Sequence, residues 1–133
     1  MIHRIAPIFL ALVAGGVLAG CGSSAPRFVA PREMEGVASY YAEEFNGRKT
    51  ANGEVYDMHA LTAAHRTLPF NTKLRVSNLN NGRSVIVRVN DRGPFKESRI
   101  LDLSLEAARR LGITREGTAR VKIEIVELGS TGE

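Results

Sequence analysis

The sequence predicts a mainly β fold, a small closed or nearly closed β-barrel with one or two short helices. Several short runs alternate apolar and polar side chains, as strands with one buried face do. An Asn-Gly pair, a strong hairpin-turn signal, lies between two of these runs. One stretch has both the start and the stop signals of a helix. Pattern alone does not give the order of the strands.

The expected strands lie between residues 35 and 128. Asn81 and Gly82 form the expected turn between the second and third of them. In the third, Val85, Val87 and Val89 share one face, which we expect to line the core. The strands are 35–41 (EGVASYY), 73–79 (KLRVSNL), 84–90 (SVIVRVN), 99–103 (RILDL) and 119–128 (ARVKIEIVEL).

A short helix is expected over residues 104–112 (SLEAARRLG). Ser104 is the expected N-cap, because its hydroxyl can accept from a free backbone N–H of the first turn. Glu106 lies in that first turn, where the helix dipole favours an acid. Gly112 is the expected C-cap.

Residues 1–20 have the pattern of a signal peptide. His3 and Arg4 give a basic start, an apolar run follows from Ile5 to about Leu18, and small residues precede Cys21. The apolar run is shorter than the roughly 20 residues that a membrane-spanning helix needs. A plain secretory cleavage site and a buried helix with a stray thiol are the alternatives.

The residues LAGC, which end at Cys21, resemble the lipobox of bacterial lipoproteins. The resemblance implies that Cys21 is acylated after the leader is removed, and several acyl chains bind a membrane essentially permanently. Gly22 after the cysteine, instead of Asp, implies anchoring at the periplasmic face of the outer membrane. We expect a lipidated cysteine and flexible tether over 21–33, a barrel domain over 34–128 and a tail over 129–133.

Composition fits one small domain. The chain has 133 residues, of which 44% are hydrophobic and 24% charged, and its one cysteine excludes an internal disulfide. The formal net charge of +4 falls by one when Arg4 is removed with the leader, and no block of five or more Lys and Arg occurs. A weakly basic surface of mixed charge argues against a nucleic-acid partner.

Residues 40–69 form a segment that the alternation does not explain. A loop of this length is usually functional or disordered, and its four aromatic residues and its interspersed apolar residues argue against disorder. It contains several ionisable side chains: Glu43, Glu44, Glu54, Asp57, His59 and His65. No spacing among them matches a zinc motif such as H-E-x-x-H, so we expect no metal.

The motifs TANGE, AAH, LP, NDRGPF and DLS occur in this order between residues 50 and 104. In this combination the chain resembles the rare lipoprotein A family over about residues 35–128. The resemblance implies a six-stranded double-psi β-barrel, the fold of barwin-like proteins and expansins. Fold alone does not determine activity.

The resemblance implies an enzyme without cofactors that acts on peptidoglycan glycan strands. Catalytic family members are lytic transglycosylases, which cleave the MurNAc–GlcNAc bond without water and leave 1,6-anhydro ends, preferably on strands lacking stem peptides. The alternative is a non-catalytic, expansin-like factor that binds the wall. We expect a monomer. Many relatives carry a carboxy-terminal peptidoglycan-binding repeat, whereas this sequence ends at ELGSTGE, so we expect no targeting through that module.

The family's functional positions correspond to Glu54 in TANGE, His65 in AAH and Asp91 in NDRGPF. Asp91 follows a strand whose valines face the core, so we expect it at the barrel rim as the general acid. Glu54 is expected to act as base or electrostatic partner, and His65 to orient a carboxyl or share the base role. The alternatives are a turn aspartate, a solvated loop acid and a structural histidine.

Arg92, Asn90, Tyr40, Tyr41 and Tyr56 are the expected substrate-binding residues. A guanidinium against Asp91 would favour the charged carboxylate and oppose proton donation, so we expect Arg92 to point away from it, toward Asp102 or a substrate carboxylate. The tyrosines, like Phe45, either stack on sugar rings or fill the core. Many family members read SWYG where this chain has SYYA, so Tyr40 replaces a tryptophan.

Overall fold

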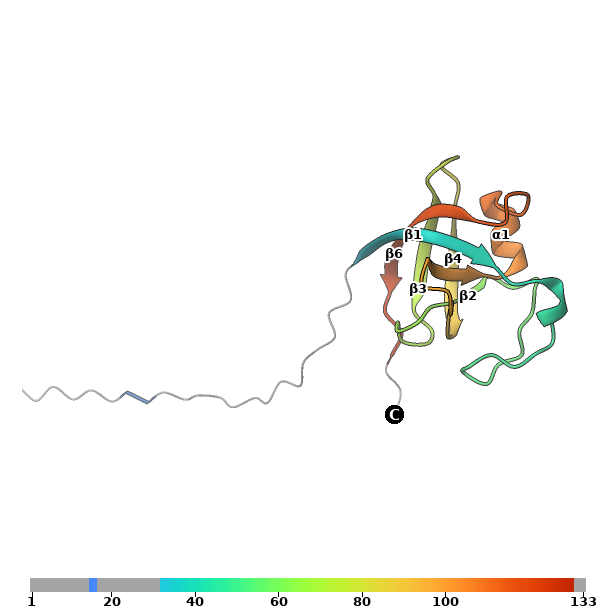
Figure 1. The fold of residues 1–133 in the computed structure, drawn as a ribbon. Helices are drawn as coiled ribbons and strands as arrows, with labels where there is room; N and C mark the ends of the chain where they lie inside the picture. The colour runs from blue at the N-terminus through green and yellow to red at the C-terminus, as the bar shows by residue number, and fades with distance from the viewer. Residues whose placement is uncertain (1–14, 17–31, 131–133) are drawn as a thin grey trace, which may run out of the picture.

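The computed structural model of the protein describes residues 15–16 and 32–130 (Figure 1). The expected acylation site at Cys21, nearly all of the signal peptide and most of the tether lie outside these residues, so their assignments stay predictions. In the described part of the chain, no helix has the length and apolar character to cross a membrane.

Six strands in the described residues form a closed barrel in the order β1-β5-β2-β4-β3-β6. The pairs β1–β5 and β2–β4 are parallel, and the other four are antiparallel. The prediction of a closed, mainly β barrel is confirmed. The elements are β1 (Glu33–Tyr40), a 3-10 helix (Glu43–Phe45), β2 (Thr62–Ala64), β3 (Lys73–Asn78), β4 (Ser84–Asp91), β5 (Arg99–Leu103), α1 (Leu105–Leu111) and β6 (Ala119–Glu127).

The core lies inside the barrel and beneath α1. The alternation predicted for β4 is correct, because Val85, Val87 and Val89 are buried while Ile86 is exposed. The same pattern buries one face of β3 and one face of β6. Helix α1 packs against β4 and β1, and buries two leucines and two alanines. The Ser104 hydroxyl accepts from the backbone N–H of Ala107, as expected of an N-cap.

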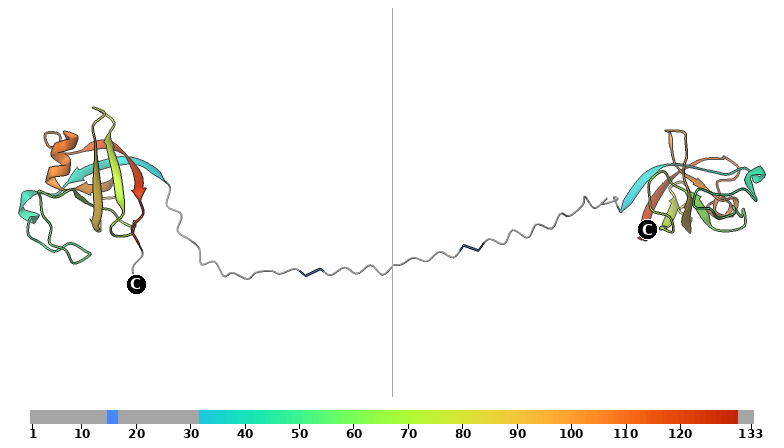
Figure 2. Two further views of the ribbon diagram at one scale, coloured as in Figure 1. Left: turned by 180° about the vertical axis from the view of Figure 1, so that it is seen from behind. Right: turned by 90° about the horizontal axis from the view of Figure 1, so that it is seen from below.

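Strand β2 lies inside the segment 40–69 that alternation left unexplained. Its three residues are all buried, so they show no alternation that would mark a strand. It pairs with β4 on one side and with β5 on the other. Between β1 and β2 the chain extends beyond the barrel wall, as both views from the side show (Figures 1 and 2).

The chain remains packed against the barrel after β6. The backbone N–H of Gly129 donates to the Thr72 hydroxyl at 2.9 Å. A Cβ at Gly129 would lie 2.0 Å from the carbonyl oxygen of Phe70, so no larger residue fits without backbone movement. Gly129, expected in the tail, therefore helps to position the loop that precedes β3.

Candidate active site

A hollow of about 630 Å³ opens where β1, β4 and β5 meet the segment that follows β1. Two carboxylates line it, those of Asp91 and Asp102. The walls also carry three cationic side chains (Lys49, Arg92 and Arg99) and four aromatic ones (Tyr40, Tyr41, Phe45 and Phe95). The hollow thus combines groups able to exchange protons with apolar ring faces.

Asp91 ends β4, and its carboxylate accepts hydrogen bonds from three directions. Oδ1 accepts from the backbone N–H of Ala51 at 2.8 Å and of Arg92 at 2.9 Å. Oδ2 accepts from the Tyr41 hydroxyl at 2.6 Å. Because backbone donors fix Oδ1 and the Tyr41 hydroxyl contacts Oδ2, the carboxylate is held in one orientation.

The backbone after Asp91 lets the carboxylate remain at the rim. Gly93 adopts φ 129°, a conformation that glycine reaches without a steric penalty. The chain therefore leaves the sheet immediately after Asp91 and Arg92. Residues 92–95 have no regular structure, and the next turn lies at Glu97 and Ser98.

Tyr41 provides a neutral donor to Asp91. Burial, and then its hydrogen bond to Asp91, raise the pKa of the Tyr41 phenol above its ordinary value. The hydroxyl therefore keeps its proton at physiological pH. The ring packs against Tyr56, with centroids 4.9 Å apart, and against Phe45, at 6.1 Å.

Asp102 is the second carboxylate of the hollow, and sequence reasoning did not assign it a site role. Ala64 of β2 pairs with Asp91 on one side and with Asp102 on the other. Neighbouring strands lie about 4.8 Å apart, so the two aspartate Cα atoms are separated by about 10 Å. The Ser39 hydroxyl donates to Oδ1 of Asp102, and Arg99 donates to the same hydroxyl at 3.2 Å.

Glu54 does not line this hollow. Its carboxylate accepts two hydrogen bonds from the Arg88 guanidinium, at 2.6 and 2.8 Å, and one from the Asn90 amide at 3.2 Å. These contacts, with Arg88 the main cause, lower the Glu54 pKa to about 2. The backbone carbonyl of Glu54 also accepts from Thr50 at 2.7 Å, which closes the turn that presents Ala51 to Asp91.

His65 also lies outside the hollow and is almost fully buried. Its Nδ1 accepts from the backbone N–H groups of Thr67 and Leu68, both at 3.1 Å. Burial, and then the charges of Arg92 and Arg66, lower the His65 pKa to about 4. Its backbone N–H donates to the carbonyl of Asp91 at 3.2 Å, so a neutral His65 joins the end of β2 to the end of β4.

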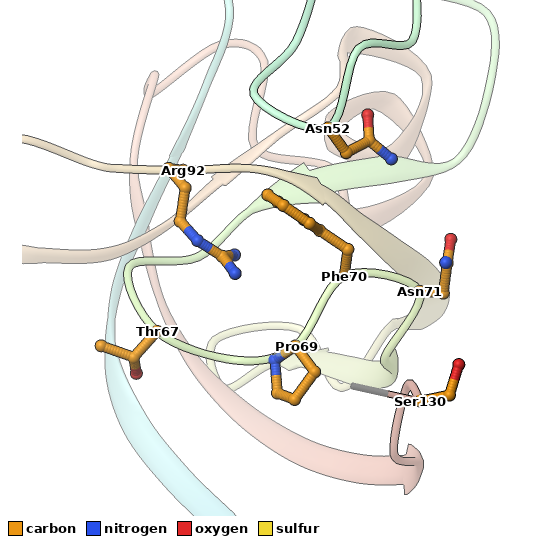
Figure 3. Close-up of a pocket in the computed structure, with 7 residues that line it drawn as sticks. All are labelled: Asn52, Thr67, Pro69, Phe70, Asn71, Arg92 and Ser130. Carbon is orange, nitrogen blue, oxygen red and sulfur yellow. The ribbon is translucent and has the colours of Figure 1, made fainter. Parts of the chain in front are cut away.

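Arg92 points away from the Asp91 carboxylate, as the sequence analysis expects. Its guanidinium lies over the Phe70 ring, 3.9 Å from the centroid, and donates to the His65 carbonyl at 3.3 Å. Figure 3 shows it reaching into a second hollow of about 550 Å³, between Thr67 and Phe70. Arg92 does not make the expected contact with Asp102, since no ion pair of 4.0 Å or less joins them within residues 32–130. The Asp102 carboxylate accepts from the Ser39 hydroxyl.

The sequence of the chain matches the model of a known protein family. The model of the family described as lytic transglycolase matches residues 33–123, which include all six strands apart from the end of β6. The chain belongs to the lytic transglycolase family. The family's name agrees with a hollow that holds carboxylates at the barrel rim.

Curated relatives carry the name endolytic peptidoglycan transglycosylase. The one from Pseudomonas aeruginosa is 57% identical over 94 residues, covering 71% of this chain and 28% of the relative. The one from Campylobacter jejuni is 54% identical over 107 residues, covering 80% and 39%. The one from Neisseria meningitidis is 55% identical over 103 residues, covering 77% and 43%. The chain therefore spans less than half the length of these relatives.

Solved structures confirm the double-psi β-barrel fold. The expansin of Clavibacter michiganensis superposes with a TM-score of 0.60 at 22% identity, covering 74% of this chain and 52% of the expansin. The Streptomyces papain inhibitor superposes with a TM-score of 0.58 at 25% identity, covering 71% and 94%. At this identity the likeness concerns the fold.

The predicted substrate-binding residues of this lytic transglycolase family member separate into two groups. Tyr40 and Tyr41 line the hollow that contains Asp91, as Arg92 does. Tyr56 is buried, and its hydroxyl accepts from the backbone N–H of Leu105 at 3.1 Å. Asn90 is buried against Glu54.

Phe95 is the aromatic residue that sequence reasoning missed. Its side chain is 93% exposed at the edge of the hollow, where its ring is open to contact with a ligand. Its place directly after NDRGP was visible in the sequence, but its exposure was not.

Among the described residues, no three His, Cys, Asp or Glu side chains gather as metal ligands.

Proposed function

We propose that the protein cleaves the MurNAc–GlcNAc bond of peptidoglycan glycan strands without water and leaves a 1,6-anhydro end. The names of the relatives, which are endolytic peptidoglycan transglycosylases, support this reaction. The observation that carries the proposal is the Asp91 carboxylate. It is oriented by two backbone N–H groups and the Tyr41 hydroxyl inside a hollow with exposed aromatic walls.

One aspartate can serve both halves of this reaction. Protonated on Oδ2, Asp91 donates its proton to the glycosidic oxygen as the bond to C1 of MurNAc breaks. The C6 hydroxyl oxygen of the same sugar then bonds to C1 and releases its proton to the Asp91 carboxylate, which restores the starting state. No water is consumed, and no cofactor is required. Tyr41 remains neutral throughout and steadies Oδ2.

Asp102 supplies the second charge that the transition state needs. Positive charge develops at C1 and the ring oxygen as the bond breaks, and a carboxylate across the hollow stabilises it. Glycosidases place their two carboxyl groups roughly 5 to 9.5 Å apart. The Cα atoms of Asp91 and Asp102 lie about 10 Å apart across Ala64, and both carboxylates line the same hollow.

Glu54 and His65 act by positioning. A carboxylate with a pKa of about 2 is a weak base at neutral pH, and Arg88 occupies both of its oxygens. The Glu54 side chain instead anchors the turn to Arg88 and Asn90 of β4. Its backbone carbonyl closes the turn that donates Ala51 N–H to Asp91. His65 holds the end of β2 against Asp91 and fixes Arg92 through its carbonyl.

We further propose that the protein works at the periplasmic face of the outer membrane, anchored through acylated Cys21. The LAGC sequence supports the anchor. Replacement of Cys21 by Ser should release the protein from the membrane fraction and abolish labelling by an alkyne-tagged fatty acid. Retention in the membrane fraction by Cys21→Ser would count against lipid anchoring.

The deciding experiment is digestion of amidase-treated peptidoglycan with the full chain, followed by mass analysis. Fragments with 1,6-anhydro ends, absent with Asp91→Asn, are the expected result. Products with reducing ends would indicate hydrolysis instead. Binding to the glycan without products would leave the non-catalytic, expansin-like wall factor as the function.

A further inference from the structure

Arg92 joins the two hollows described above. It is the one described residue that lines both, with Asp91 and Asp102 on one side and Phe70 and Thr67 on the other. It also directly follows Asp91 in the chain. A ligand bound in the hollow of Asp91 can therefore contact the Arg92 side chain, which lines that hollow as well.

The guanidinium is held in place by groups that leave its charge uncompensated. Phe70 covers one face, and the His65 carbonyl accepts from Nη1. Within residues 32–130, the ion pairs at 4.0 Å or less do not include Arg92, whereas Arg88 is paired with Glu54. Stacking on a ring and a carbonyl contact fix the plane of the guanidinium and leave N–H donors for a ligand.

The other cations of the hollow are less suited to bind an anion. Arg99 donates to the Ser39 hydroxyl, next to the Asp102 carboxylate, so its charge faces an acid of the protein itself. Lys49 is exposed on the segment after β1, and its single ammonium group gives no planar, bidentate geometry. Arg92 thus combines a fixed orientation with a position next to Asp91.

We propose that Arg92 binds the free lactyl carboxylate of the MurNAc residue whose bond is cleaved. This inference rests on the proposed function and deepens it. The lactyl group is the only anionic group on an otherwise neutral glycan strand, and a guanidinium binds a carboxylate through two parallel hydrogen bonds. The group is attached to the same sugar ring as the C1 atom that reacts, and Arg92 adjoins Asp91, which protonates the glycosidic oxygen bonded to C1.

This contact would give a physical cause for the preference for stripped glycan that the family resemblance implies. A stem peptide converts the lactyl carboxyl into an amide, which removes the negative charge and one acceptor oxygen. Arg92 then faces a neutral amide with a bulky substituent and loses its charge-assisted contact with the lactyl group. The protein should therefore favour strands from which amidases have removed the peptides, through a residue that takes no part in proton transfer.

Binding measurements with three tetrasaccharides test this assignment. The first is GlcNAc-MurNAc-GlcNAc-MurNAc with free lactyl carboxylates, the second is the same glycan with those groups converted to methylamides, and the third is tetra-N-acetylchitotetraose. Titrations use the full chain carrying Asp91→Asn, so that bound glycan is not cut. The free acid should bind about 10- to 100-fold more tightly than the methylamide, as expected for a hydrogen-bonded charge pair.

Variants at position 92 then test whether Arg92 causes the preference for the free acid over the methylamide. Arg92→Gln should abolish the difference between acid and methylamide, and Arg92→Lys should keep a small part of it. Arg115→Gln removes the same charge from an exposed turn that lines neither hollow, and it should keep the full preference. Thermal unfolding checks that each variant is folded. If Arg92→Gln does not fold, the loss of preference in Arg92→Lys tests the role of Arg92 instead.

Equal affinity of the parent protein for acid and methylamide would overturn the inference, as would an undiminished preference in Arg92→Gln. Cleavage is measured separately with the wild-type chain on amidase-treated strands. Discrimination in binding without any cleavage would refute the proposed activity while supporting the role of Arg92. Cleavage without discrimination in binding would support the proposed activity and refute the role of Arg92.

Discussion

The Tyr41 hydroxyl lies 2.6 Å from Oδ2 of Asp91, although 50 positions separate the two residues in the sequence. Tyr41 directly follows β1, and Asp91 ends β4. The contact therefore exists only when the barrel is closed. It gives Oδ2 of Asp91 a neutral neighbour, because the Tyr41 hydroxyl keeps its proton at physiological pH.

Replacing Tyr41 by Phe should lower kcat by about tenfold, because one hydrogen bond to a charged group is lost while the ring packing stays. KM should change little, since the ring still lines the hollow. The matched control is Tyr40→Phe, whose hydroxyl donates to the Thr114 carbonyl and not to Asp91. Equal effects of the two substitutions would contradict a specific role of the Tyr41 hydroxyl.

Asp91→Asn should reduce cleavage of stripped glycan by about 10²- to 10⁴-fold, because the acid–base group is removed. Asp102→Asn should also lower kcat, by about 10²-fold, because one charge near C1 is lost. Both variants should still bind the glycan, and thermal unfolding should show folded protein. Anhydro products at the wild-type rate from Asp102→Asn would exclude Asp102 from the reaction.

Glu54 and Arg88 should behave as one unit. Glu54→Gln and Arg88→Gln should each lower activity by roughly the same factor, and the double variant should be no worse than either, because all three disrupt the same contact. The expected loss of stability is about 1 kcal/mol or less, since both side chains are about one-third exposed. An effect of Glu54→Gln far larger than that of Arg88→Gln would indicate that Glu54 itself transfers a proton.

His65 should make stability depend on pH. The folded protein has a His65 pKa of about 4, below the ordinary 6.5, so the unfolded chain takes up a proton first as the pH falls. Stability from this group is full above about pH 6.5 and is lost between about 6.5 and 4. NMR of the imidazole carbons and urea unfolding across this range measure both effects.

His65→Asn provides the matched variant for that experiment. The asparagine oxygen can still accept from the N–H groups of Thr67 and Leu68, yet it does not titrate. Near-wild-type stability at pH 7 with a flatter pH dependence is expected, together with substantial residual activity. Complete loss of cleavage in a folded His65→Asn protein would show that the imidazole itself takes part in catalysis.

Much of the barrel could be predicted because its long strands have one buried face. The valines of β4 alternate with polar or exposed residues, and the Asn81-Gly82 turn joins β4 to β3. Strand β2 was not predicted, because its three buried residues show no alternation. Its place between β4 and β5 depends on pairings far apart in the sequence. The closure of the sheet is a non-local property.

The site could be predicted only where the position of a residue follows from its neighbours in the sequence. Asp91 follows a recognisable strand and precedes a Gly-Pro pair, so its place at the rim follows from local rules. Asp102 looked like one polar residue in β5, because only the pairing of both aspartates with Ala64 brings it to the hollow. Glu54 looked like a solvated loop acid or a base, and its pairing with Arg88, 34 positions away, was not visible in the sequence.

The three-residue strand β2 has a consequence for protein engineering. Since sheet pairing through Ala64 sets the separation of Asp91 and Asp102, the segments 42–49 and 95–98, which hold none of the donors to Asp91, can change in composition without altering that separation. Exchanging these segments between relatives should therefore produce enzymes with new glycan preferences on an unchanged reacting pair. The scaffold and the specificity of this barrel are encoded in different parts of the chain.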